Sequence, residues 1–325
     1  MEFHIKVLLL SFAVSTILGL IIIPILRRLK VGQIERDDGP ESHLKKQGTP
    51  TMGGIIIAAA IFIVCTFLYI DYSKTEIDVA KNILPLLFVT IGFGLVGFVD
   101  DFKKLVLKNT KGLKPIYKML GLLIIAVGYT LFLTNVLKIG TDTYIPFLKI
   151  YINMPIWIYI PFAIFVLLGT TNAVNLTDGI DGLSTTVTTI ILAFFTVVGI
   201  ILGVKEVVLI GACLVGACLG FLLFNLHPAK VFMGDTGSLL LGGAIAGIAL
   251  YLKMPIILII VALIPVIETI SVMLQVTYFK KTGKRIFKMA PIHHHFELCG
   301  WSENKVVSIF SIITLILCIV GINAI

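Results

Sequence analysis

Residues 207–226 read VVLIGACLVGACLGFLLFNL, a stretch without a single charged side chain. A helix of about 20 such residues matches the hydrocarbon thickness of a bilayer and satisfies its own backbone hydrogen bonds there. Hydrophobic residues make up 58% of the 325-residue chain and charged residues only 14%, which excludes an ordinary soluble domain. The sequence therefore predicts an all-α integral membrane protein with one polytopic domain over residues 1–325.

Nine further runs have the same character, so about ten transmembrane helices are predicted. The first run lacks a small-residue cleavage site, and Arg27 and Arg28 follow Pro24 at its end, which indicates a retained helix rather than a signal peptide. Residues 137–153, the longest outward loop, favour a small hairpin. The ten runs cover about residues 5–25, 53–70, 82–99, 115–136, 154–171, 184–203, 207–226, 237–252, 255–279 and 305–324.

Basic residues are distributed unevenly between the two sides of these helices. Ten spans put both termini on one side, and all but seven of the 26 Lys and Arg residues lie in loops of the other side. Because positively charged loops stay in the cytoplasm, both termini are predicted to face outward. The net charge of +8 has a second interpretation, the attraction of anionic head groups or anionic substrates to the inward face.

The cysteines and one glycine motif predict packing rather than a cofactor site. None of the five cysteines forms a CxxC pair, and four lie in apolar runs, as small buried hydrophobes do. Gly92, Gly94 and Gly97 match GxGxxG, but inside a membrane helix this spacing is typical of close helix packing.

Two acidic motifs lie on the inward side. Asp100 and Asp101 end the third run; neighbouring carboxylates raise each other's proton affinity, which suits one to accept a proton and the other to face Mg²⁺. A helix end charged only for topology is the alternative. The next inward turn, NAVNLTDGIDGL at 172–183, holds four amide or carboxylate side chains with glycines that permit close approach of a ligand. These four candidate binding residues are Asn172, Asn175, Asp178 and Asp181.

A third segment, residues 225–238, places Asp235 next to Gly234 at the start of the eighth run. A helix N-terminus favours phosphate, and a lone carboxylate there suits a metal ion. The alternative is that Asp235 or Thr236 simply caps the helix. Phe232 is either a buried anchor or a stacking platform for a base.

The remaining candidates lie in the inward loops and in the ninth run. The loop from residue 33 to 54 combines Lys46 with a Gly/Thr-rich turn that includes Thr51, a composition that suits phosphate capture. Glu268 lies near the middle of the ninth run, where a carboxylate is either functional or hydrogen-bonded inside the bundle, and Gln275 lies nearer the cytoplasm.

Residues 289–297 read MAPIHHHFE, and three of the chain's six histidines stand consecutively there as His293, His294 and His295. Three adjacent side chains point in different directions and cannot all ligate one ion, and no cysteine pair completes a zinc site. We therefore expect them to act on substrate.

Together these segments resemble the polyprenyl-phosphate sugar-1-phosphate transferases. The resemblance covers nearly the whole chain, and PIHHHFE at 291–297 points to the phospho-N-acetylmuramoyl-pentapeptide transferase branch. It implies a bacterial multi-pass enzyme of the cytoplasmic membrane, often a homodimer, with its active site on the cytoplasmic face. The implied reaction moves phospho-MurNAc-pentapeptide from UDP-MurNAc-pentapeptide to undecaprenyl phosphate, giving UMP and lipid I for peptidoglycan. The implied partners are these two substrates and membrane lipids, with no nucleic acid.

The resemblance also implies roles for individual residues. Asp235 is implied to bind Mg²⁺, and Asp100, Asp101 and His294 to be catalytic. The residues implied to bind substrate are Lys46, Thr51, Asn172, Asn175, Asp178, Asp181, Phe232, Gly234, Gln275, His293 and His295.

Two questions stay open at the level of sequence. In-line attack by the lipid phosphate with Asp100 as base competes with a covalent aspartyl-phosphate intermediate. A lipid phosphate is already largely dianionic near neutral pH, so a base contributes little. The alternatives for function are a transferase that uses another UDP-HexNAc and a secondary transporter. A transporter would need paired ionisable groups near the middle of the membrane, and Glu268 is a single such group.

Overall fold

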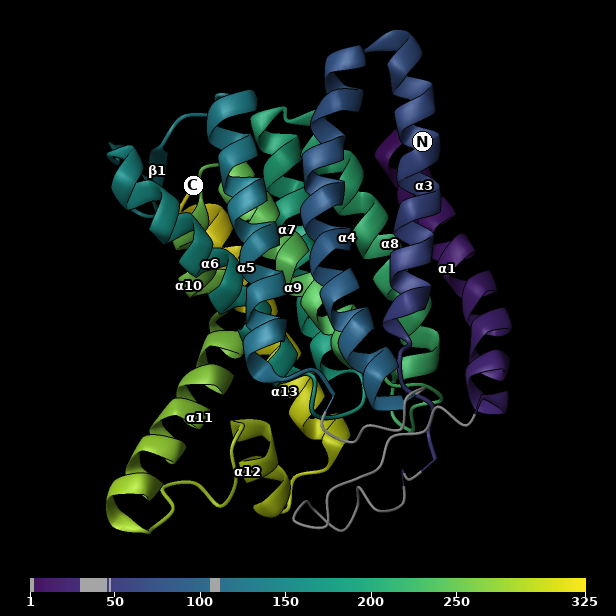
Figure 1. The fold of residues 1–325 in the computed structure, drawn as a ribbon, viewed down its shortest axis with the longest axis vertical. Coiled ribbons are helices and arrows are strands. Elements are labelled where there is room, and N and C mark those ends of the chain that lie inside the picture. The colour runs from purple at the N-terminus through teal and green to yellow at the C-terminus, as the bar shows by residue number, and fades with distance from the viewer. Residues whose placement is uncertain (1–2, 30–45, 47, 106–111) are drawn as a thin grey trace.

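The computed structural model describes residues 3–29, 46, 48–105 and 112–325. Over these residues the chain forms twelve α-helices and one two-stranded hairpin, and most helices run along the long axis of the molecule (Figure 1). Nine of the described helices are long and apolar enough to cross a membrane. The predicted all-α membrane protein is confirmed to that extent. Most of the predicted phosphate-capturing loop, residues 33–45 and 47, lies outside the described residues.

Ten long helices correspond to the ten predicted runs. They are α1 (Phe3–Arg28), α3 (Gly54–Thr75), α4 (Ile77–Leu105), α5 (Pro115–Leu131), α6 (Ile156–Thr177), α7 (Leu183–Leu202), α8 (Lys205–Asn225), α9 (Gly234–Tyr251), α11 (Leu263–Thr282) and α13 (Glu303–Asn323). The short elements are the π-helical turn η1 (Phe132–Val136), strands β1 (Asp142–Ile145) and β2 (Ile150–Asn153), the 3₁₀ turn η2 (Pro255–Ile257), α10 (Leu258–Val261) and α12 (Ile292–Leu298). The antiparallel pair β1–β2 confirms the hairpin predicted for residues 137–153.

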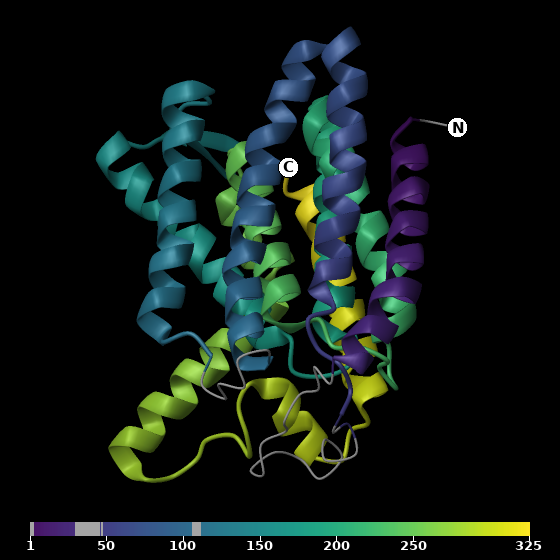
Figure 2. The same ribbon diagram turned by 45° about the vertical axis from the view of Figure 1, so that its right-hand side comes forward.

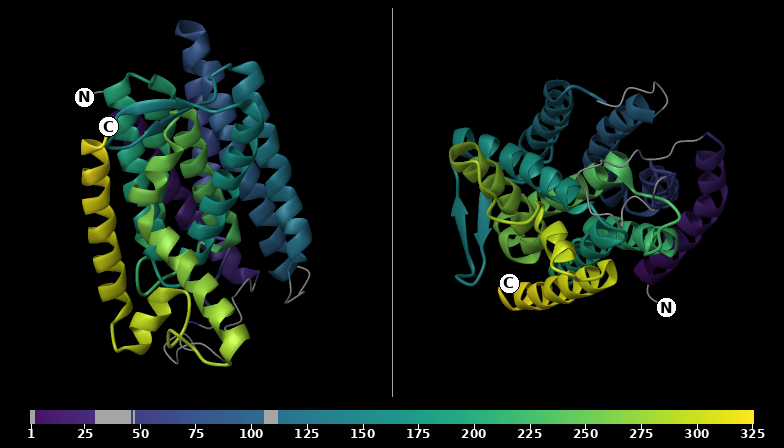
Figure 3. Two further views of the ribbon diagram at one scale, coloured as in Figure 1. Left: turned by 90° about the vertical axis from the view of Figure 1, so that its left-hand side faces the viewer. Right: turned by 90° about the horizontal axis from the view of Figure 1, so that it is seen from below.

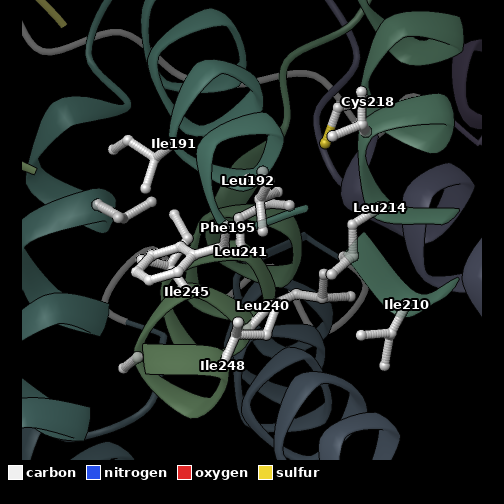
Figure 4. Close-up of a cluster of buried hydrophobic side chains, with 14 of the residues drawn as sticks. Ile191, Leu192, Phe195, Ile210, Leu214, Cys218, Leu240, Leu241, Ile245 and Ile248 are labelled. Carbon is white, nitrogen blue, oxygen red and sulfur yellow. The ribbon is translucent and has the colours of Figure 1, made fainter. Parts of the chain in front are cut away.

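Helix α9 differs from the other long helices, because it lies in the middle of the bundle and is not one of the nine candidate spans. Every residue from Thr236 to Leu250 is buried. Side chains of α7, α8 and α9 meet in one apolar cluster (Figure 4). A helix surrounded by protein needs no apolar surface toward lipid, which allows α9 to be rich in glycine. The run at 237–252 is therefore a central helix with weaker hydropathy than a lipid-facing span.

Glycines let the helices approach closely, as predicted from the GxGxxG motif. A Cβ at Gly97 would lie 2.1 Å from the carbonyl oxygen of Asp235, and one at Gly94 would touch Leu240. A Cβ at Gly92 would lie 2.9 Å from a methyl of Ile125 in α5. The motif thus packs α4 against α9 and α5, and its interpretation as helix packing is confirmed.

The single helix predicted at 255–279 is wrong. The segment breaks into η2, α10 and α11, with the last break at Ala262. Pro265 has no amide hydrogen to donate to the carbonyl of Val261, which favours a break at this point and suits Pro265 to the first turn of α11. Helix α11 then leaves the bundle obliquely and runs on to Thr282 (Figure 1).

The two termini lie at one end of the molecule, and α12 lies at the other (Figures 2 and 3). We refer to the end that carries α12 as the α12 end. The carboxyl-terminal end of α4 and the first turn of α9 meet there, because Asp101 bonds to the backbone of Thr236. The acidic motifs of the sequence therefore converge on one end of the bundle.

Candidate active site

Three aspartates from α4 and α9 form a compact cluster at the α12 end. Asp100, Asp101 and Asp235 each offer a carboxylate oxygen within 4.8 Å of the others. Asp100 and Asp101 are buried, and Asp235 is partly buried. We call these three residues the acidic cluster. Such closely spaced hard oxygen donors can hold a divalent cation.

Asp101 caps α9 from a different helix. Its carboxylate accepts hydrogen bonds from the amides of Asp235 (3.2 Å) and Thr236 (2.8 Å) and from the Thr236 hydroxyl (2.7 Å). Free amides at a helix N-terminus attract negative charge, so this contact stabilises both the helix and the ionised carboxylate. Helix α9 has no side-chain cap of its own, so the alternative in which Asp235 or Thr236 caps it is wrong.

Asp235 is held by three side chains from three other helices or helix ends. Its Oδ2 lies 2.8 Å from Nζ of Lys104 and 3.0 Å from Nζ of Lys118. Its Oδ1 accepts a hydrogen bond from the Asn175 amide at 2.7 Å, and that amide also donates to Ser238 at 2.8 Å. Asp235 is thus the point at which α4, α5, α6 and α9 meet.

Asp100 shares the same lysines. Its carboxylate lies 2.6 Å from Nζ of Lys104 and 3.8 Å from Nζ of Lys118, and it accepts a hydrogen bond from the amide of Leu113 at 2.7 Å. Unlike Asp101, it makes only one hydrogen bond to the backbone among the described residues. Asp100 is therefore the carboxylate that faces the two lysines, whereas Asp101 faces the start of α9.

Asp178 adds a fourth carboxylate next to the acidic cluster. It follows α6 directly and accepts a hydrogen bond from the amide of Gly234. Burial raises the pKa of Asp178 well above its usual range, and the negative charges of Asp235 and Asp101 raise it further. The acidic cluster itself places three carboxylates beside the two ammonium groups of Lys104 and Lys118. This excess of carboxylates over ammonium groups suits a divalent cation.

A second polar cluster surrounds Lys46. Its Nζ lies 2.8 Å from Asp181 and 2.6 Å from Glu303, the first residue of α13. Asp181 also lies 2.9 Å from Nδ1 of His227 and accepts a hydrogen bond from the amide of Ala229. Burial lowers the pKa of Lys46, but the two carboxylates outweigh it, so this pKa lies above its ordinary value.

Thr51 and Phe232 lie in two segments that pair through their backbones. The amide of Phe232 donates to the carbonyl of Pro50, and the amide of Gly53 donates to the carbonyl of Phe232, both at 2.8 Å. Gly234 has a φ of 75°, and a Cβ there would lie 2.9 Å from the Thr51 hydroxyl and 2.8 Å from the Asp101 carboxylate. Only glycine fits this position, which connects the Lys46 side of the site to the acidic cluster.

The three histidines of α12 contact three different partners. His293 is buried, and its Nδ1 lies 3.0 Å from Oε1 of Glu268. His294 lies 2.7 Å from Glu297, and His295 accepts a hydrogen bond from the amide of Lys288 at 3.1 Å. Their divergence agrees with the argument that they do not ligate one ion.

Two predicted binding residues bond elsewhere. The Asn172 amide donates to the carbonyl of Leu168 within α6. Gln275 bonds to the backbone of Ile286 and Phe287, so it fixes the segment that leads into α12. The contacts of the described residues do not join either side chain to the acidic cluster.

Sequence reasoning did not select several residues that the structure brings into these clusters. A lysine or a glutamate near a helix end is usually solvated, and no local signal distinguishes these from other charged helix ends. Only Lys104, four residues after Asp100, had a usable signal, because i,i+4 spacing predicts an ion pair on a helix. The residues concerned are Lys104, Lys118, His227, Ser238 and Glu303.

Comparison with known proteins agrees with this arrangement of residues. The profile described as Glycosyl transferase family 4 matches residues 83–253, and the Phospho-N-acetylmuramoyl-pentapeptide-transferase signature 1 matches residues 46–57. These matched segments contain the acidic cluster, the 172–183 turn, Lys46 and Thr51.

Curated relatives match along almost the entire chain. The Phospho-N-acetylmuramoyl-pentapeptide-transferase of Acetivibrio thermocellus is 51% identical over 98% of this chain and 94% of its own length. The proteins of the same name from Clostridium botulinum and Halalkalibacterium halodurans are 53% and 51% identical, over 97% and 93% of this chain and 94% and 91% of their own lengths. Identity at this level over nearly full length is decisive, and the chain belongs to the phospho-N-acetylmuramoyl-pentapeptide-transferase family.

Proposed function

We propose that this chain transfers phospho-MurNAc-pentapeptide from UDP-MurNAc-pentapeptide to undecaprenyl phosphate, and that the acidic cluster is the place of transfer. The products are UMP and lipid I, the lipid-linked intermediate of peptidoglycan synthesis. The observation that carries the proposal is the convergence of Asp100, Asp101, Asp178 and Asp235 with Lys104 and Lys118 at one end of a membrane helix bundle. Reactions between two anionic substrates need such a combination of cation-binding oxygens and fixed positive charge.

The acidic cluster fits Mg²⁺, for which Asp235 would supply an oxygen ligand, since Mg²⁺ often takes only one or two carboxylates. The three carboxylates lie within 4.8 Å of one another, and the local charge is negative even with both lysines counted. When bound, Mg²⁺ neutralises phosphate charge and polarises the phosphorus that is attacked. Asp101 keeps its bonds to the start of α9 and thereby orients Asp235.

The transfer itself is an in-line displacement. An oxygen of the lipid phosphate attacks the sugar-linked phosphorus, forming one P–O bond, and the bond from that phosphorus to the bridging oxygen breaks, so that oxygen leaves with UMP. Asp100 takes the proton from any monoanionic lipid phosphate, because its carboxylate lies beside the two lysines that attract that phosphate. Lys104 and Lys118 hold the negative charge that moves to the leaving group.

The nucleotide-sugar is proposed to lie between the acidic cluster and the Lys46 cluster. Phe232 is partly exposed between the two and is the stacking platform for uracil. The proposed binding residues are Lys46, Thr51, Asn172, Asn175, Asp178, Asp181, Phe232, Gly234, Gln275, His293 and His295, with His294 acting on the transferred group.

The α12 end is proposed to face the cytoplasm, with both termini outside, and the protein is proposed to form a homodimer. The distribution of Lys and Arg supports the orientation, as does the position of both termini opposite α12 (Figure 2). A reporter enzyme that is active only outside the cytoplasmic membrane should therefore be active when it is fused to the C-terminus. A reporter that is active only in the cytoplasm should be silent at the same position.

The proposed homodimer is tested by native mass spectrometry in detergent, which should give twice the mass of one chain.

The substrate assignment is tested by following UMP release from the purified protein with Mg²⁺ and undecaprenyl phosphate. UDP-MurNAc-pentapeptide should be turned over at least roughly a hundredfold faster than UDP-GlcNAc. A substrate that lacks polar groups for which the site is built leaves the polar side chains of the protein unpaired, and this lowers its rate. Equal rates with the two nucleotides would favour a broader UDP-HexNAc transferase, and no release from either would contradict the proposal.

The displacement predicts that no reaction occurs before the lipid binds. Labelled UMP should therefore not exchange into UDP-MurNAc-pentapeptide when undecaprenyl phosphate is absent. The measurement follows the label in the nucleotide-sugar over several enzyme equivalents. Exchange without the lipid would instead support an aspartyl-phosphate intermediate.

A further inference from the structure

Glu268 and His293 form a fully buried pair that joins α11 to α12. Neither side chain has any exposed surface, and Oε1 of Glu268 lies 3.0 Å from Nδ1 of His293. The distance is that of an ion pair, although the angle is not that of a hydrogen bond. The amide of His293 also approaches Glu268 Oε2, at 3.5 Å. The carboxylate therefore contacts both the ring and the backbone at the start of α12.

The other edge of the His293 ring presses on the turn that follows α6. A Cβ built on Gly179 would lie 2.1 Å from Nε2 of His293 and 2.7 Å from Cε1. Nε2 itself is buried and has no hydrogen-bond partner among the described residues. The ring therefore fills the space that any residue other than glycine would need at position 179.

Gly179 follows Asp178 directly, and Asp178 accepts the amide hydrogen of Gly234, the residue before Asp235. A continuous line of contacts thus runs from Glu268 through His293 and the 178–179 turn to the start of α9. On its other side, His293 lies against His294, with ring centroids 4.1 Å apart. The buried ring of His293 therefore lies between His294 and the 178–179 turn.

We propose that Glu268 is a positioning residue for the nucleotide-sugar, and that it acts through His293. Its carboxylate holds the imidazole against Gly179, and this contact sets the distance between Asp178 and His294. The inference rests on the proposed function, because the substrate bound between these groups is UDP-MurNAc-pentapeptide.

A packing role alone does not account for this pair. A buried carboxylate is costly inside a membrane protein, and an amide or an apolar side chain would fill the same space at lower cost. A carboxylate 3.0 Å from Nδ1, by contrast, attracts that edge of the ring and so favours one ring orientation. The charge of Glu268, rather than its volume, is therefore the property that should matter.

The experiment compares Glu268→Gln, Glu268→Asp, His293→Gln and the double variant Glu268→Gln/His293→Gln. Glu268→Gln, which keeps the shape and removes the charge, should raise the KM for UDP-MurNAc-pentapeptide about tenfold, within the range of coupling between contacting residues. The KM for undecaprenyl phosphate should stay within twofold of the wild-type value. Glu268→Asp, which keeps the charge, should recover part of the loss. The double variant should be no worse than the poorer single variant.

Two matched controls separate positioning from general damage. Glu206 is another buried carboxylate, at the end of the bundle opposite α12, where it bonds to Asn82 and Tyr251. Glu206→Gln should leave the KM values for both substrates unchanged. Gly179→Ala should raise the KM for UDP-MurNAc-pentapeptide, as Glu268→Gln does. Gly169→Ala in α6 should leave this KM unchanged, because a Cβ at Gly169 meets no atom within 4 Å.

A wild-type KM in Glu268→Gln, or single effects that add in the double variant, would overturn the inference. If Glu268→Gln does not fold, the KM for UDP-MurNAc-pentapeptide is measured in Glu268→Asp and Gly179→Ala instead. Wild-type values in both of these variants would overturn the inference. Thermal unfolding of the wild type, Glu268→Gln, His293→Gln and the double variant measures the coupling between the two residues without turnover. Changes in Tm that add in the double variant would also overturn the inference. Absence of UMP release in the wild type would contradict the proposed function instead.

Discussion

Replacing Asp235 by asparagine is expected to reduce turnover roughly a thousandfold or more while the protein still folds. Asp235 is the residue at which α4, α5, α6 and α9 meet, and its Oδ2 contacts both lysines of the site. Asparagine has nearly the same shape, so the packing of α9 should be retained. It has no charge, however, so it binds Mg²⁺ poorly and leaves Asp100 as the carboxylate that still contacts both ammonium groups.

The measurement is UMP release as a function of Mg²⁺ concentration, together with the thermal unfolding curve in detergent. Asp142→Asn is a suitable control, because Asp142 forms an ion pair with Lys253 in the hairpin on the other end of the bundle. That variant should keep its turnover. Asp235→Asn with near-normal Mg²⁺-dependent turnover would remove Asp235 from the proposed metal site.

Gly97→Ala should be a strongly damaging single methyl addition near the site. Its Cβ would lie 2.1 Å from the carbonyl oxygen and 2.5 Å from the carbonyl carbon of Asp235. These atoms are backbone, so α4 and α9 would have to separate, at a cost of roughly 1–3 kcal/mol or more in the free energy of unfolding. Separation would also stretch the bonds from Asp101 to α9, and a displacement of about 1 Å typically costs a hundredfold in rate.

The stability change is read from thermal unfolding, and the rate change from UMP release by the folded fraction. Gly128→Ala in α5 is the matched control, because its Cβ would meet only the ring of Phe88, at 3.8 Å. It should unfold and turn over like the wild type. A Gly97→Ala protein as stable as Gly128→Ala would show that the two helices are not in close contact.

Much of the site was predictable, because each membrane carboxylate needs a reason to be there. Asp100, Asp101 and Asp235 stand at helix ends on one predicted side of the membrane, and the structure brings their carboxylates together. The 172–183 turn was likewise identified by its density of polar side chains, and Asn175 and Asp178 do contact the cluster or its neighbour Gly234.

Partners from distant elements were not predictable in this way. The sequence does not indicate that Asp101 caps α9, because the cap residue lies more than a hundred positions before the helix that it caps. Glu303 next to Lys46 and His293 next to Gly179 are contacts of the same kind. Each depends on which helix ends meet, and helix order in space is not encoded locally.

Hydropathy predicted the helical membrane architecture, because backbone in a bilayer must satisfy its own hydrogen bonds and a spanning helix needs a long apolar run. The turn and strand residues of the loop predicted the hairpin. The positions of the acidic motifs between the apolar runs predicted that these motifs would lie on one side of the membrane. Tertiary structure decided that α9 would be central rather than lipid-facing and that the ninth run would break at Ala262. It also decided which charges would pair, since the energy of an ion pair or a cap depends on distances of a few ångströms between segments far apart in the chain.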